Sequence, residues 1–173
     1  SGFYSWKKLG AFGADLGALA CFFAKPWQRL APGLSDDQAW LLNEAAFRLR
    51  ALGRLEEALE LRRAGALMNV EQADWKNAAI SYSHLSQLQL SLGHIALAVV
   101  DAERSVDYAD RSGNTFQRVV RRTVLADVRH QQGEREAARC GFAEAEAMQA
   151  EREPEHPLLY SQAGFRYCEL LLA

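Results

Sequence analysis

The chain has 173 residues, and 49% of them are hydrophobic, which is enough to bury a core in one domain or one continuous array. Its 20 basic side chains nearly balance its 22 acidic ones, so the overall charge gives no reason to expect binding to nucleic acid or to an anionic membrane. Any charged site must therefore be local.

The cysteines and histidines are too scattered for a disulfide framework or a metal site. Cys21, Cys140 and Cys168 form no Cys-x-x-Cys pair. No two of the four histidines have the i, i+4 spacing with which one helix face holds a metal. We therefore expect no metal, no cofactor and a location in the reducing cytoplasm.

Residues 1–34 are predicted to form an N-terminal helix followed by a proline-containing loop, AKPWQRLAPGLS. Leu9, Phe12, Leu16, Leu19 and Phe23 recur at three- and four-residue steps, which predicts a helix with one apolar stripe. A second face of glycines and an alanine would let another helix pack closely. We interpret the segment as the second helix of an upstream repeat or as an N-terminal cap.

The same segment also has the basic start and apolar run of a secretion signal. Lys7 and Lys8 precede LGAFGADLGALACFF, in which Cys21 stands where a lipoprotein signal would end. Asp15 within the run argues against export, and the run is too short and too interrupted to span a bilayer. We therefore predict no export and no membrane contact.

Residues 35–173 contain three copies of a repeat with a period of forty residues. The stretches ALGRLEEAL, SLGHIALAV and QQGEREAAR align on Gly53, Gly93 and Gly133. Small residues hold fixed positions around these glycines, and they are Ala46, Ser86 and Ala126 seven residues before, Ala58, Ala98 and Ala138 five residues after, and Gly65, Ser105 and Ala145 twelve residues after. Chance would seldom keep these columns small in three copies.

The columns predict antiparallel helix pairs. A glycine ends a helix by adopting the left-handed conformation without a steric penalty, and small residues on both helices let the two backbones approach closely. We predict first helices at residues 36–52, 74–92 and 114–132, and second helices of four to five turns from about residues 54, 94 and 134. The expected N-caps are Ser35 or Asp36, Asp74 and Asn114.

A last helix, PLLYSQAGFRYCELLLA, is predicted to begin at Pro157 and to repeat the first-helix pattern. Gly164 falls in the small column, Tyr160 aligns with Tyr82, and Tyr167 falls in the seam between helices. The array of about three and a half pairs thus ends with an uncovered apolar face, although repeat arrays usually end in a polar cap. Because the chain also lacks an initiating methionine, we expect a piece of a longer protein; dimerisation through the C-terminal helix is the alternative.

The glycine and alanine columns resemble those of the tetratricopeptide repeat (TPR) family. The resemblance covers about residue 36 to the end, and it implies an all-α, right-handed α-solenoid of antiparallel helix pairs. The repeat departs from the family in its forty-residue length and in the residues Val70, Asp110 and Ala150, where a proline commonly closes the unit. Repeats of this length, with WLLNEAAFRLRALGRLEEALE as an example, are similar to the sensor arrays of bacterial multidomain signalling ATPases.

No catalytic motif is present in the sequence. We find no Gly-rich phosphate loop, no Gly-x-Ser-x-Gly elbow and no His-Glu-x-x-His. The carboxylate groups Glu56, Glu57 and Glu60, and Glu144 and Glu146, lie on predicted helices rich in basic residues and are interpreted as solvated faces. The chain is therefore not expected to be an enzyme.

The resemblance implies that a ligand lies in the concave groove lined by the first helices. Helical spacing selects the residues that point there, and they are Trp40, Asn43, Phe47, Arg50, Ser83, Gln87, Leu90, Thr123, Asp127 and His130. The polar members could bind a peptide backbone, and Trp40 and Phe47 could anchor an apolar side chain. The alternative is an ordinary wet surface, with these two aromatic residues packed against the N-terminal helix.

One predicted helix also carries an arginine cluster that could bind a carboxylate or a phosphate. Its members are Arg118, Arg121, Arg122 and Arg129. Carboxylates on the preceding helix could neutralise several of these charges, and the candidates are Asp101, Glu103, Asp107 and Asp110. Because no basic stripe with interleaved aromatic residues occurs, nucleic-acid binding is not expected.

The sequence thus favours a cytoplasmic, non-catalytic interaction module that recognises a peptide or a neighbouring domain and belongs to a larger signalling or scaffold protein. The alternative is a structural spacer or self-association module that uses the exposed terminal helix. An enzyme would instead need a deep pocket in which Asp127 and His130 face one another.

Overall fold

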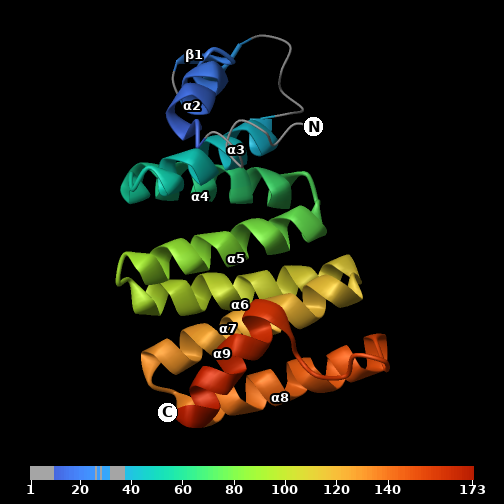
Figure 1. Ribbon diagram of the computed structural model, residues 1–173. Helices are drawn as coiled ribbons and strands as arrows, with labels where there is room; N and C mark the ends of the chain where they lie inside the picture. The colour runs from blue at the N-terminus through green and yellow to red at the C-terminus, as the bar shows by residue number, and fades with distance from the viewer. Residues whose placement is uncertain (1–9, 26, 28, 32–37) are drawn as a thin grey trace. The chain divides into compact units, whose positions relative to one another are not determined.

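The computed structural model describes residues 10–25, 27, 29–31 and 38–173 (Figure 1). They form two compact units, one ending at Glu71 and the other beginning at Gln72. Both units consist mainly of antiparallel helices, which confirms the all-α class. The predicted boundary after residue 34 falls among residues outside the described ranges, so it stays a prediction.

The three predicted helix pairs are confirmed. Their first helices are α3 (Gln38–Ala51), α5 (Trp75–Ser91) and α7 (Thr115–Gln132). Their second helices are α4 (Leu55–Glu71), α6 (Ile95–Ser112) and α8 (Arg135–Arg152). The first pair lies in the first unit, and the other two pairs lie in the second. The predicted cap at Ser35 or Asp36 lies outside the described residues.

The turns within the pairs have the backbone geometry that the sequence predicts. Gly53, Gly93 and Gly133 have φ angles of +76°, +80° and +92°, a region that favours glycine over residues with a Cβ atom. The caps of the later pairs are also as predicted. The Asp74 side chain accepts a hydrogen bond from the backbone N–H of residue 77 (3.1 Å), and that of Asn114 accepts one from residue 117 (2.9 Å).

The small columns lie at the contacts between paired helices. All six alanines and serines of the two main columns are buried, with at most 1% of their surface exposed, and they are Ala46, Ser86, Ala126, Ala58, Ala98 and Ala138. In the α5–α6 pair, the Ser86 hydroxyl donates a hydrogen bond to the Ala98 carbonyl at 2.7 Å. The Ser105 hydroxyl donates one in the opposite direction, to the Ala79 carbonyl at 2.8 Å. Each bond joins a side chain of one helix to the backbone of the other, so the two helices must lie close together.

The N-terminal segment is only partly as predicted. The helix α2 (Phe12–Ala20) buries Leu16 and Leu19, as its apolar stripe indicates. Phe23 is buried too, but it lies in a strand, β1 (Phe23–Lys25), paired antiparallel with β2 (Arg29–Leu30). An aromatic residue fits a half-buried strand as well as a helix face, so the apolar spacing alone could not place the helix end. The glycines Gly13 and Gly17 face open space among the described residues, so the expected close packing on that face is not seen there.

The terminal helix α9 (Ser161–Leu172) begins four residues later than predicted and packs on α7 and α8. Tyr167 stacks on Phe142 with ring centroids 5.0 Å apart, which confirms its seam position. Gly164 has a different role from the one predicted, because a Cβ atom there would lie 2.4 Å from the Leu159 carbonyl oxygen. The glycine therefore allows the extended chain before α9 to lie against its first turn. Tyr160 is 55% exposed in that extended segment, so its alignment with a buried tyrosine of α5 was wrong.

Substituting Gly164 by alanine should destabilise the protein by about 1–3 kcal/mol, because the added methyl group meets a backbone oxygen that cannot rotate away. The matched control is Gly17→Ala, at a helical position with open space around the new atom. There the usual helix preference for alanine should stabilise by about 0.5–1 kcal/mol. Urea unfolding followed by circular dichroism measures both; a gain in stability for Gly164→Ala would contradict the close contact.

Candidate functional site

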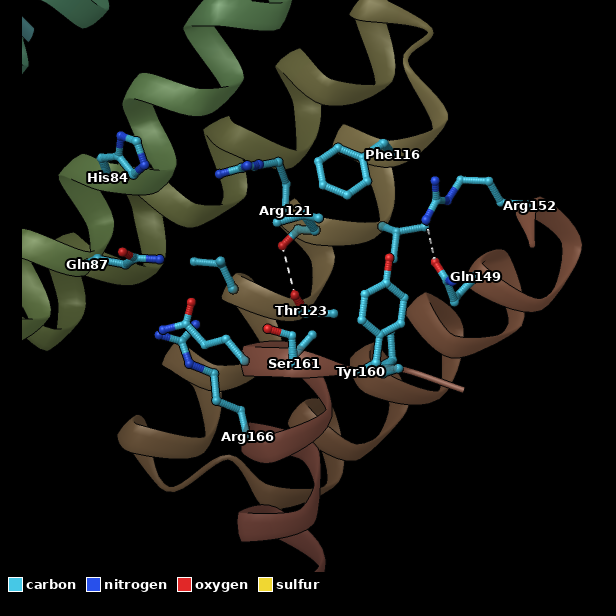
Figure 2. Close-up of a pocket in the computed structure, with 16 residues that line it drawn as sticks. His84, Gln87, Phe116, Arg121, Thr123, Gln149, Arg152, Tyr160, Ser161 and Arg166 are labelled. Atoms are coloured by element: carbon cyan, nitrogen blue, oxygen red, sulfur yellow. Dashed lines mark hydrogen bonds between the residues drawn. The ribbon is translucent and has the colours of Figure 1, made fainter. Parts of the chain in front are cut away.

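The second unit contains a cleft between α5, α7 and α9, with a volume of about 400 Å³ (Figure 2). Its lining residues are His84, Gln87, Phe116, Val119, Val120, Arg121, Thr123, Val124, Gln149, Arg152, Leu159, Tyr160, Ser161, Gln162, Ala163 and Arg166. This volume lies within the range of ligand-binding pockets in proteins. The lining combines apolar side chains with hydrogen-bonding groups, as peptide-binding surfaces do.

The cleft follows from the way α9 enters the unit. The Glu146 carboxylate of α8 accepts a hydrogen bond from the Leu159 backbone N–H (3.3 Å), and Gln149 donates one to the His156 carbonyl (3.0 Å). These bonds hold residues 156–159 along α8. The chain then turns at Ser161, whose φ of +57° is unusual for a residue other than glycine. The first turn of α9 therefore stands at one wall of the cleft, and α7 provides another.

Of the predicted groove residues in the second unit, Gln87 and Thr123 line the cleft. Two others are packed against neighbouring residues and are not open groove positions. Ser83 is fully buried, and Leu90 packs against the core cluster around Val128. Both lie on the inner side of α5 because the helix is packed on more than one face, whereas the prediction assumed one open face.

Asp127 and His130 do not line the cleft. Asp127 is only 6% exposed and forms an ion pair with Arg166 of α9, with 3.1 Å between Oδ2 and Nε. Burial raises the pKa of Asp127, and the positive charges of Arg166 and His130 oppose this shift. The carboxylate therefore holds α9 against α7, which corrects its predicted place in an open groove.

The four predicted residues of the first unit have mixed surroundings. Trp40 and Arg50 are exposed. Phe47 is 38% exposed, and its ring centroid lies 6.2 Å from that of a phenylalanine of α2, as in the alternative interpretation of an aromatic residue packed on the N-terminal helix. Asn43 accepts a hydrogen bond from Arg62 of α4 at 2.9 Å, so part of its amide group serves the α3–α4 contact.

Two of the clustered arginines are neutralised by carboxylates. Arg118 and Arg122 donate hydrogen bonds to Asp110 at 2.8 and 3.0 Å, and Arg122 also reaches Glu144 at 2.7 Å. Partial burial alone would raise the pKa of Asp110, but the bonds from the two arginines outweigh it and hold that pKa below its ordinary value. These arginines link α6, α7 and α8.

The other two clustered arginines differ from each other. Arg129 donates a hydrogen bond to Glu103 of α6 at 3.3 Å. Arg121 lines the cleft, is only 8% exposed, and has a buried Nε atom without a hydrogen-bond partner in the described part of the chain. Burial lowers the pKa of Arg121 to about 10. The predicted four-arginine cluster is thus three paired side chains and one separate group in the cleft.

Several lining residues were not predicted, and Arg152, Phe116 and Gln149 are the main examples. The Arg152 guanidinium lies 5.3 Å from the centre of the Phe116 ring, donates to Gln149 Oε1 at 2.9 Å, and pairs with Glu153 at 2.8 Å. Gln149 and Arg152 were missed because the family resemblance places ligands on first helices, whereas this wall uses the end of the second helix α8. Phe116 is on a first helix, but near its start, before the predicted set of that helix begins at Thr123. The two prolines after α8 are the signal that the chain turns there.

Among residues 10–25, 27, 29–31 and 38–173, no group of three or more His, Cys, Asp or Glu side chains could hold a metal ion. No helix in the same ranges is both long enough and apolar enough to cross a lipid bilayer.

Comparison with solved structures identifies the fold. The chain is similar to a predicted kinesin light chain of Podosopora anserina with nearly identical TPR-like repeats, with a TM-score of 0.73, 16% sequence identity, and coverage of 96% of this chain and 81% of that chain. A crystal structure of a point variant of that protein gives a TM-score of 0.72, 14% identity and coverage of 96% and 80%. These likenesses confirm the predicted TPR-like solenoid fold. No protein-family model and no curated protein matches the sequence.

Replacing Asp110 by asparagine should lower the urea midpoint at neutral pH, because Arg118 and Arg122 lose their shared carboxylate. Since the folded-state pKa of Asp110 is depressed, its contribution is present above the unfolded value of about 3.9 and is lost as the pH falls through the folded value. The difference in urea midpoint between wild type and variant should therefore disappear at acidic pH. Asp107→Asn, an exposed carboxylate of the same helix, is the control. A gap that stays constant from neutral to strongly acidic pH would contradict this assignment.

Proposed function

We propose that the chain is a non-catalytic protein–protein interaction module, and that the cleft of the second unit binds an extended peptide segment of a partner. The observation that carries the proposal is the cleft itself, with an apolar wall and polar groups along its rim. Val119, Val120 and Val124 of α7 provide apolar surface, while Gln87 of α5 and Gln162 of α9 offer amide groups. Amides of this kind can bind a peptide backbone irrespective of its side chains.

The cleft suits a peptide because its lining extends over several helices. It is lined from α5 across α7 to the first turn of α9, and Tyr160 and Phe116 stand exposed at its edge, 55% and 46% accessible. Exposed aromatic residues beside a cleft are frequent anchors for partner side chains, because they contribute much contact area with few rotatable bonds. The TPR-like fold supports the same proposal, since helix-pair arrays present extended concave binding surfaces.

The wider setting is also a proposal. The forty-residue repeat and its resemblance to sensor arrays of bacterial signalling ATPases lead us to propose a cytoplasmic signalling or scaffold protein as the parent of this chain. In such a protein, the bound segment would belong to a partner or to a neighbouring domain. The exposed residues Trp40 and Arg50 of α3 would then be a second contact surface, in the first unit.

The proposal is tested by filling the cleft with a large side chain. Short peptides selected from a random display library against the wild-type protein should lose at least about tenfold in affinity for Gln87→Trp, because the indole fills the space beside α7. The matched control is Gln132→Trp, the same change at an exposed position of α7 that is not among the lining residues. Fluorescence anisotropy with labelled peptides gives both affinities. Equal loss in the two variants would refute a peptide site in the cleft.

A second function is favoured by the apolar surface of α9. Phe165, Leu171 and Leu172 are 62%, 59% and 89% exposed, and Leu158 just before the helix is 66% exposed. Large apolar side chains exposed to this extent on one short helix favour a contact surface. The chain would then act as a self-association or spacer module through its terminal helix.

This second function predicts a concentration-dependent mass. Light scattering across a dilution series should show dimers of the wild-type chain, and Phe165→Glu should shift the chain to monomer by placing a charge in the apolar contact. Leu97→Glu, which places the same charge on an exposed apolar side chain of α6, serves as the control, because α9 packs on α7 and α8. A chain that remains monomeric at high concentration would exclude self-association through α9.

A further inference from the structure

The side chain of Arg121 has an unusual position for a charged group. It is 8% exposed and lines the cleft of the second unit. Figure 2 shows it extending from α7 toward α5, on the side of the cleft where His84 lies. Its Nε atom is buried and has no hydrogen-bond partner among the described residues, and no ion pair with a carboxylate is found for this arginine in the same ranges.

A buried guanidinium without a carboxylate partner destabilises the folded state. Removing a charge from water carries a penalty of several kcal/mol, which proteins normally offset with a carboxylate and with hydrogen bonds. The neighbouring Arg118 and Arg122 follow this rule, since both bond to Asp110. Arg121 does not follow it, and the lowered pKa of this residue, to about 10, has burial as its cause. The folding of the unit therefore leaves this charge uncompensated.

The other lining residues of the cleft do not compensate the positive charge of Arg121. Three of the lining residues are arginines, and no Asp or Glu occurs among the described lining residues. Arg152 is paired with Glu153, and Arg166 with Asp127, so both have carboxylates of their own. The cleft thus retains the positive charge of Arg121 inside a partly water-excluded site, where an electrostatic attraction is stronger than at an open surface.

We propose that Arg121 binds an anionic group of the partner peptide, either a side-chain carboxylate or a phosphate, by paired N–H···O hydrogen bonds within the cleft. This rests on the proposed function, because the anion is carried by the peptide that the cleft binds. The planar guanidinium offers parallel donors that match the two oxygens of either group. The partner is therefore an acidic or phosphorylated segment, and its negative charge offsets that of the guanidinium, for which no carboxylate partner is found among the described residues.

The first experiment tests the arginine with simple anions. Titrating the protein with inorganic phosphate, and separately with acetate, at constant ionic strength should move the side-chain Nε–Hε NMR signal of Arg121. The signals of Arg118 and Arg122, whose guanidinium groups are already bonded, should move much less. Phosphate-dependent shifts confined to those two side chains would overturn the proposal.

The second experiment uses the peptides selected on the wild-type cleft. Replacing their acidic residues by the neutral amides should weaken binding to the wild type by roughly 10- to 100-fold, and Arg121→Gln should remove the difference between acidic and neutral peptides. Arg118→Gln, one turn earlier on the same helix, removes the same charge and should keep the preference. Phosphoserine in place of the acidic residue distinguishes a phosphate site from a carboxylate site.

The outcomes of the proposed function and of this inference can be told apart. Peptides that bind the cleft equally well whether acidic or neutral would preserve the interaction module but overturn the role of Arg121. If the library yields no peptide, the proposed function fails, and the phosphate titration alone then decides whether Arg121 is an anion site.

A measurement of stability separates binding from a structural role. Arg121→Met keeps the length of the side chain and removes the buried charge, so the urea midpoint of the unliganded protein should rise, while binding of acidic peptides is lost. If the arginine instead held the helices together, its replacement by methionine would lower the urea midpoint. A fall in the midpoint for Arg121→Met would therefore count against the proposal.

Discussion

The close approach of two helix backbones is the constraint on which the rest of the structure depends. In the α5–α6 pair, Ser86 and Ser105 each donate a hydrogen bond to a carbonyl of the opposite helix, which is possible only because the side chains at these crossings are small. In the next pair, a Cβ atom on Gly141 would already lie 3.1 Å from the Cβ of Ala126. Larger residues in these columns would separate the helices and lose the core contacts between them.

The same constraint decides where polar groups can lie in the second unit. Because α7 is packed against α6 and α8, the polar side chains on its contact faces need partners there, as Arg122 finds in Asp110 and Glu144. On the side of α7 toward α5 and α9, Asp127 binds Arg166 of α9, but Arg121 Nε has no hydrogen-bond partner in the described part of the chain. The helices around the cleft therefore pack together without satisfying every hydrogen-bond donor on α7.

The sequence predicts best what depends on neighbours along the chain. The turns at Gly53, Gly93 and Gly133 and the caps at Asp74 and Asn114 are local events, and the structure has all of them. The candidate site depends on contacts between distant segments and was predicted only in part. The contact of Gly164 with the Leu159 carbonyl sets the entry of α9, and no periodic pattern indicates it. The burial of Ser83 likewise depends on packing against several helices at once.

The arginines of α7 could nevertheless have been separated from the sequence by helical geometry. An α-helix turns by about 100° per residue, so residues four apart differ by only about 40°, whereas adjacent residues face clearly different directions. Arg118 and Arg122 therefore share a face, and the structure pairs both with Asp110, while Arg121 points elsewhere. Four arginines in one helix are thus two sets with different environments. Three are paired with carboxylates of α6 and α8, and the fourth faces the cleft. The second kind has no ion pair within the described part of the chain, and for that reason we propose it, and not the other three, as the anion site.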